Sequence, residues 1–210
     1  MDGVASFDEI NKLGKARSES FDQYFSDMDL NDEQKKERIS FSEDAENVLL
    51  TIIGLIAIQK AFDSLDREYA TYQLETQYRG VVASYTGIDE YLETYIKDYS
   101  TDFVDTTFEN IEDIWFLSED RAMFNAENEA NTTLNYKDYL KAIASGKTQK
   151  TWLTYGDSRV RKTHRPLDGK TIPITGLFEV GDSLMRFAKD TKYFPATKEI
   201  ANCRCQTKYS

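Results

Sequence analysis

The sequence predicts an α+β protein, with a mainly helical N-terminal region that contains a long helix and a small C-terminal domain with short antiparallel strands. Three observations predict this fold class. All three prolines lie beyond residue 165, and a long stretch without proline favours helix. The apolar residues of that stretch recur at helical spacing. Short β-prone runs, separated by glycine, proline and aspartate, begin only near residue 150.

The strongest periodic pattern lies within a helix that we expect over residues 43–84. Its apolar residues are spaced alternately three and four positions apart, which places them in one seam on a single helix face. One interpretation of the seam is core packing in a helical bundle. The other is a surface that binds a protein partner or a second copy of the chain, because tyrosine tolerates a partly hydrated groove. The seam consists of Leu55, Ile58, Phe62, Leu65, Tyr69 and Tyr72.

Caps and breaks divide the rest of the chain. Asn31 is a residue type that accepts hydrogen bonds from the first N–H groups of a helix, so we expect a helix to begin there. Residues 86–89, Thr-Gly-Ile-Asp, predict the end of one helix and the cap of the next. The expected domains are a helical interaction region over residues 1–118, as a stalk or bundle, and an α+β domain over residues 119–210. Further helices are expected over about 6–30, 118–130 and 135–145, the last with Asn135 as its cap, and strands are expected over 151–155, 171–175 and 177–180.

The two parts of the chain carry opposite charge. Residues 1–140 contain 12 Lys and Arg against 31 Asp and Glu, whereas residues 141–210 contain 14 against 6. Because the acidic part would repel nucleic acid, this balance disfavours a protein that only binds DNA. The basic part is either an ordinary solvated surface or a surface for DNA or an acidic partner. The candidate phosphate contacts are Lys147, Lys150, Arg159, Arg161 and Lys162.

Cysteine usage and hydropathy exclude two further classes of protein. Cys203 and Cys205 are separated by one residue, and such close neighbours rarely form a mutual disulfide. A disulfide-rich secreted scaffold is therefore excluded, and a reducing compartment is favoured. The N-terminal residues are acidic and lack the apolar core of a signal peptide. The most apolar run, residues 48–58, is too short to span a bilayer, so we expect no membrane partner.

All the histidine and cysteine of the chain lies beyond residue 163, at His164, Cys203 and Cys205. These side chains are of the types that bind zinc, and Asp157 or water would complete a tetrahedral site. The Cys-x-Cys pair differs from the usual spacing of a zinc knuckle, however, and a fourth soft ligand is missing. Zinc is the one cofactor that these residues suggest.

Two other interpretations of the same residues stay open. In a catalytic one, His164 is a general base oriented by Asp157 or Asp168, and Arg161 or Arg159 holds an anion. In a structural one, Asp157 accepts hydrogen bonds from Arg159 and Arg161, and His164 forms a hydrogen bond with buried backbone. The terminal strand then pairs with the first strand of the domain.

Several short motifs follow one another in the C-terminal part of the chain. A tryptophan is followed by Gly-Asp-Ser-Arg-Val-Arg, a histidine, Leu-Asp-Gly, a strand with a phenylalanine, a proline and Asn-Cys-Arg-Cys. This ordered set, over about residues 120–208, resembles the phage Mu protein F-like family. The positions that match are Trp152, Asp157, Arg159, Arg161, His164, Asp168, Gly169, Pro195, Asn202, Cys203 and Cys205.

The resemblance implies a minor head protein of a tailed phage that acts in head morphogenesis. Its implied partners are the portal protein, the major capsid protein and packaged double-stranded DNA, and the helix over residues 43–84 would bind the portal or a second copy. It places the protein in the virion, in the head near the portal, and in the host cytoplasm during assembly. It implies no settled reaction. The alternative function is a zinc-dependent, hydrolase-like effector carried in the phage head.

Overall fold

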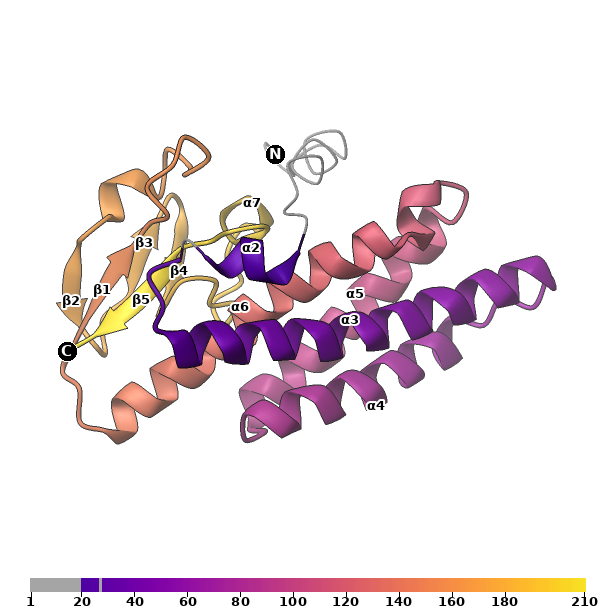
Figure 1. Cartoon of the computed structure of the whole chain (residues 1–210), viewed down its shortest axis with the longest axis horizontal. Coiled ribbons are helices and arrows are strands. Elements are labelled where there is room, and N and C mark those ends of the chain that lie inside the picture. The colour runs from indigo at the N-terminus through magenta and orange to yellow at the C-terminus, as the bar shows by residue number, and fades with distance from the viewer. Residues whose placement is uncertain (1–19, 27) are drawn as a thin grey trace. The chain divides into compact units, whose positions relative to one another are not determined.

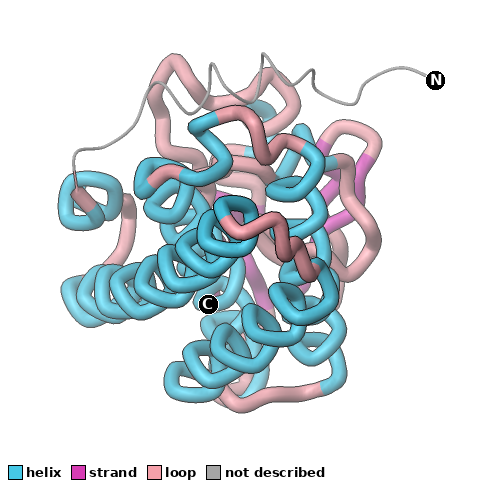
Figure 2. The backbone as a smooth tube through the Cα atoms, turned by 90° about the vertical axis from the view of Figure 1, so that its right-hand side faces the viewer, coloured by secondary structure: helices cyan, strands magenta, loops and turns pink. Residues whose placement is uncertain are grey.

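The computed structural model describes residues 20–26 and 28–210 and has the predicted α+β class (Figure 1, Figure 2). Residues 40–129 form one compact unit, and residues 130–210 form another with the described part of residues 1–39. The boundary predicted between residues 118 and 119 falls at the start of α6, and the domain division stays a prediction. The helices are α2 (Phe21–Ser26), α3 (Asp32–Ala61), α4 (Arg67–Tyr85), α5 (Glu90–Glu109), η1 (Ile114–Leu117), α6 (Glu119–Ala144), η2 (Arg165–Leu167) and α7 (Thr197–Ile200).

Two predicted helix starts are confirmed by their caps. The side-chain oxygen of Asn31 accepts a hydrogen bond from the backbone N–H of Gln34 at 2.9 Å, and the Gln34 side chain accepts one from the Asn31 N–H at 3.2 Å. This reciprocal pair satisfies backbone donors that α3 leaves unpaired. Asp89 caps α5 by accepting from the Leu92 N–H at 3.0 Å. The helix expected over 6–30 lies largely outside the described residues, which contain only α2 of that segment.

The two helices expected over 118–130 and 135–145 are wrong, because one helix, α6, spans both. Asn135 suggested a helix start because asparagine favours caps. In the structure Asn135 is buried and its amide bonds to groups outside the helix. It donates to the backbone carbonyl of Ala188 at 2.9 Å and accepts from the Arg38 guanidinium at 3.0 Å. An asparagine that is satisfied in this way does not compete for the helix backbone.

The single helix expected over 43–84 is also wrong, because the segment forms α3 and α4, joined by residues 62–66. Asp63 adopts a left-handed conformation with a φ of 51°, which ends α3. Asp66 then caps α4 by accepting from the Tyr69 N–H at 2.9 Å. The apolar spacing continues through this turn without interruption, so periodicity alone did not reveal the break.

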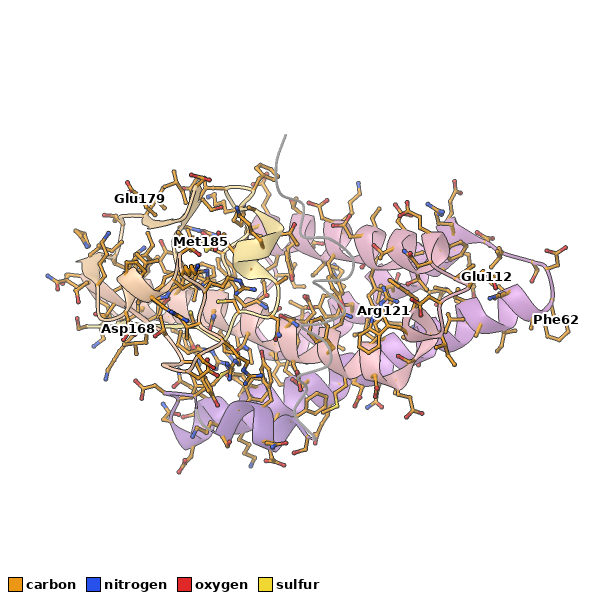
Figure 3. The ribbon with its side chains drawn as sticks, turned by 90° about the horizontal axis from the view of Figure 1, so that it is seen from above. Phe62, Glu112, Arg121, Asp168, Glu179 and Met185 are labelled. Atoms are coloured by element: carbon orange, nitrogen blue, oxygen red, sulfur yellow. The ribbon has the colours of Figure 1, made fainter. Side chains whose placement is uncertain are left out.

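The apolar seam of this segment is largely exposed. Phe62 is 78% exposed and points away from the ribbon at the α3–α4 turn (Figure 3). The core of the unit is built from other faces of the same helices, including Ile52 and Ile56 of α3 and Leu74 of α4. Core packing is therefore the wrong interpretation for most of the seam. The exposed members are Ile58 (61%), Phe62, Leu65 (48%), Tyr69 (48%) and Tyr72 (62%).

A buried carboxylate joins three helices in the core of the 40–129 unit. Glu129 on α6 accepts hydrogen bonds from the hydroxyl of Tyr78 on α4 at 2.6 Å and the hydroxyl of Tyr95 on α5 at 2.8 Å. Burial raises the pKa of Tyr78 well above its usual value, so its hydroxyl keeps the proton that it donates. On the same helix, the Arg121 guanidinium lies 3.9 Å from the centroid of the Phe103 ring (Figure 3). Polar contacts thus fix how the helices of this unit pack.

The C-terminal strands form two small antiparallel sheets. β5 (Gln206–Tyr209) pairs with β1 (Gln149–Leu153) so that Thr207 lies opposite Trp152, which confirms the predicted pairing of the terminal strand with the first strand of the domain. The second sheet is a hairpin that packs with both cysteines and Trp152 in one apolar cluster. The strand order of the first sheet is β2 (Thr171–Pro173), β1 (Gln149–Leu153) and β5 (Gln206–Tyr209), and the hairpin consists of β3 (Phe178–Val180) and β4 (Ser183–Met185).

The Tyr78 hydroxyl provides a test of the helical core. We expect Tyr78→Phe to lower the free energy of unfolding by about 1–3 kcal/mol, because the variant removes the buried hydrogen bond from the Tyr78 hydroxyl to the Glu129 carboxylate. The matched control is Tyr85→Phe, whose hydroxyl donates to Asp44 at 2.7 Å on the exposed surface. We expect this control to change stability by no more than about 0.5 kcal/mol. Urea denaturation measures both values, and equal losses would contradict the central role of Glu129.

Candidate functional site

The histidine and the two cysteines are distant in sequence and meet beside Trp152. His164 ends the loop after β1, and both cysteines lie between α7 and β5. Gly169, with a φ of 72°, turns the chain back so that its N–H donates to the Trp152 carbonyl at 2.8 Å. The pairing of β5 with β1 returns the cysteine segment to the same place. The imidazole packs edge-on against the indole, with 5.6 Å between ring centroids.

The three side chains form a compact buried cluster. Nδ1 of His164 lies 3.3 Å from Sγ of Cys205 and 3.6 Å from Sγ of Cys203. All the atoms that could bind a metal lie within 4.8 Å of one another. His164 is only 1% exposed, Cys203 2% and Cys205 4%. The structure thus brings together the residues that were predicted as zinc ligands, while metal binding itself stays a prediction.

Glu199 is a fourth member of the cluster, and the sequence did not reveal it. Its Oε2 lies 3.1 Å from Nε2 of His164 and accepts a hydrogen bond from the Thr163 hydroxyl at 2.7 Å. An ionised carboxylate only accepts hydrogen bonds, so a hydrogen bond to ionised Glu199 requires a proton on Nε2, while Nδ1 faces the sulfurs. A lysine precedes Glu199 and an isoleucine follows it in α7, so its place four residues before Cys203 was the only sequence signal.

Short local signals position α7 and the cysteine segment. Pro195 comes two residues before α7, where its fixed φ is compatible with a helix start. Asn202 follows the helix with a φ of 51°, a left-handed conformation that asparagine tolerates better than most residues. This turn directs Cys203 into the core, where its N–H bonds to the Ile200 carbonyl at 3.2 Å.

The pKa values of the two thiols shift in opposite directions. A hydrogen bond from Cys205 lowers the pKa of Cys203 well below its usual value, and His164 and Arg161 act in the same direction. The same hydrogen bond raises the pKa of Cys205, because this thiol is the donor to a neighbouring thiolate. The contact between the two thiols thus favours the thiolate form of Cys203 and the protonated form of Cys205.

The aspartates that were predicted to orient His164 bond elsewhere, so that part of the catalytic hypothesis is wrong. Asp157 accepts from the Arg159 N–H at 3.0 Å and from the Arg204 guanidinium. Partial burial raises the pKa of Asp157, but these arginine contacts outweigh it and the pKa is lowered. Asp168 is exposed (Figure 3) and accepts from the backbone N–H of Thr154 at 2.8 Å. Glu199 takes the orienting position instead.

A family model described as phage Mu protein F like protein matches residues 89–208, which is more than half of the chain. The chain belongs to the phage Mu protein F-like family. The match begins at Asp89, the N-cap residue of α5, upstream of the motifs on which the resemblance was based. Comparison with curated proteins and with solved structures gives no match.

As a member of the Mu F-like family, the protein takes part in phage head morphogenesis and is a component of the virion. Among the described residues, no helix is both long and apolar enough to cross a membrane.

The basic residues proposed as DNA contacts of this Mu F-like protein differ in accessibility. Lys147 and Lys162 are exposed, and the Arg159 side chain is 52% exposed beside Asp157. Arg161 is half-buried and donates to the backbone carbonyl of Ala201. Lys150 is fully buried and donates to the Gly176 carbonyl at 2.7 Å, so its assignment as a DNA contact is wrong.

The buried amine of Lys150 predicts a dependence of stability on pH. Desolvation lowers the pKa of Lys150 from 10.5 to about 8 in the folded Mu F-like protein. Between these values the unfolded chain keeps a proton that the folded chain has released, so stability rises with pH. We expect the stability of the wild type relative to Lys150→Met to increase from pH 8 to pH 10.5. Urea denaturation across this range measures the difference, and a constant or falling difference would contradict the assignment.

Proposed function

We propose that the protein is a minor head component that acts in morphogenesis by docking onto the portal through the exposed part of the apolar seam. We call this part the α3–α4 apolar surface and define it as Ile58, Phe62, Leu65, Tyr69 and Tyr72. Its exposure is the observation that supports the proposal. A run of large apolar side chains on the surface of a folded protein often marks a site of protein association.

The residue types of this surface fit a protein interface. Phenylalanine and tyrosine are enriched at the buried centres of interfaces, and a few such residues usually supply most of the binding energy. Asp63, Asp66 and Glu68 lie between members of this surface in the sequence and are exposed. An apolar centre beside carboxylates predicts a partner surface with an apolar pocket and a basic rim.

Phe62 provides the test of this proposal. We expect Phe62→Asp to remove the protein from purified heads and proheads and to abolish its binding to purified portal, because a charged side chain cannot enter an apolar pocket. Since Phe62 is 78% exposed, the variant should fold as the wild type does. The matched control is Phe194→Asp, at a phenylalanine that is 91% exposed and lies outside the α3–α4 apolar surface.

Binding of the Phe62→Asp variant to portal as tightly as the wild type would contradict portal docking through this surface. If Phe62→Asp instead changes only the oligomeric state of the free protein, the surface is assigned to self-association. Light scattering of the purified wild type and of purified Phe62→Asp separates these outcomes.

We also propose that the exposed basic side chains of residues 141–210 contact packaged DNA. The excess of Lys and Arg in this part and the exposure of Lys147 and Lys162 support this role. We expect Lys162→Glu to weaken DNA binding and to reduce the slope of log affinity against log salt by about 1, as loss of one phosphate contact requires. Lys97→Glu, at an exposed lysine of the acidic part, is the control. Equal slopes for the wild type and Lys162→Glu would remove Lys162 from the contact set.

The alternative function, a zinc hydrolase-like effector, receives less support from the geometry. A hydrolytic site must admit a substrate to the metal or to the general base. His164, both cysteines and Glu199 are all at least 96% buried, and the imidazole is already bonded on both nitrogens. We therefore adopt head assembly as the proposed function.

A further inference from the structure

We infer that His164, Cys203 and Cys205 bind a divalent metal ion of the zinc class, through Nδ1 of the imidazole and the two Sγ atoms. This inference is independent of portal docking and concerns only the C-terminal unit. Neutral imidazole and thiolate are the ligands that zinc prefers in proteins, and the donors here come from two segments about forty residues apart. Such a metal would therefore connect the loop after β1 to the segment before β5.

The distances between the donor atoms fit one tetrahedral ion. With a metal–nitrogen bond of about 2.0 Å and metal–sulfur bonds of about 2.3 Å, the nitrogen and sulfur atoms of a tetrahedral site lie about 3.5 Å apart. The two distances from Nδ1 to sulfur are 3.3 Å and 3.6 Å. An ion would need little movement of the side chains, and a solvent molecule would fill the fourth position.

Glu199 occupies the place of an outer-shell partner for a metal-bound histidine. A histidine ligand usually donates its second ring N–H to a carboxylate, which fixes the tautomer and the ring orientation. Oε2 of Glu199 lies 3.1 Å from Nε2 of His164, in position to accept this hydrogen bond, and it also accepts one from the Thr163 hydroxyl. Gly181 leaves room for the carboxylate, because a Cβ at this position would lie 2.9 Å from Oε1 of Glu199. Glu199 of α7 and Gly181 of the turn between β3 and β4 thus both shape the surroundings of Nε2.

The two sulfurs lie in the apolar cluster around Trp152 and are at least 96% buried. Thiol ligands lose their protons when they bind a metal, and a divalent cation would balance the charge of the two thiolates in this apolar environment.

The test uses the purified full-length chain. We expect stoichiometric zinc in the protein as isolated, measured by elemental analysis. After removal of metal with a chelator, added Co²⁺ should produce the absorption of a thiolate-bound ion, and added zinc should raise the unfolding temperature. Protein without stoichiometric zinc that also shows no thiolate–Co²⁺ absorption would overturn the inference and leave a metal-free thiol–imidazole cluster.

Variants separate the ligands from residues that only pack around them. Cys205→Ser should lose the thiolate–Co²⁺ absorption and the zinc-dependent rise in unfolding temperature. Val180→Ala, at a buried neighbour in the same apolar cluster, should lower stability but keep the metal. Glu199→Gln should keep the metal with affinity reduced about 10- to 100-fold, as expected for an outer-shell partner.

Zinc affinity of Cys205→Ser equal to that of the wild type would overturn the inference. If Cys205→Ser does not fold, the Co²⁺ spectrum of the wild type and the affinity of Glu199→Gln decide the question. Unchanged affinity in Glu199→Gln, together with no thiolate absorption in the wild type, counts against the site.

Discussion

The C-terminal unit depends on one buried contact, in which the His164 imidazole is held by Glu199 on one side and by two cysteine sulfurs on the other. These side chains come from the loop after β1, from α7 and from the segment that leads into β5. Each is a polar group that would be costly to bury alone, and each is satisfied by another member of the cluster. The family motif therefore acts first as an internal connection of the small sheet domain, next to the apolar cluster around Trp152.

The helical unit follows a different constraint. Its buried carboxylate, Glu129, receives hydroxyl groups from two neighbouring helices, so the register of those helices is set by polar contacts inside an apolar core. Once the core is satisfied, the α3–α4 apolar surface remains outside it. Exposed apolar side chains in a strongly acidic region support the proposed role of this surface in association with a partner.

The sequence was most informative where the determinant is local. The caps at Asn31 and Asp89 depend on one or two residues, and β1, β2 and β3 overlap the short β-prone runs. Prediction from the sequence failed where a tertiary contact gives a residue a different role from the one that its local sequence suggests. Asn135 resembles a helix cap but is satisfied by Arg38, and Lys150 resembles a DNA contact but is buried.

The candidate site shows the same division. Its histidine and cysteines could be selected from the sequence because they are the rare residue types of the chain. Glu199 could not, because glutamate is abundant and nothing in its short helix marks it as buried. The seam was predicted as one helix face but is divided between α3, the turn and α4, and periodicity does not indicate whether apolar side chains meet the core or the solvent.

The most direct test of the account is the state of the single histidine, observed by long-range proton–nitrogen NMR of the full chain. A buried imidazole bonded to Glu199 should carry its proton on Nε2, and that proton should exchange slowly with water. A proton on Nδ1 alone, or a ring N–H that exchanges as fast as that of an exposed histidine, would contradict the buried cluster on which the C-terminal unit depends.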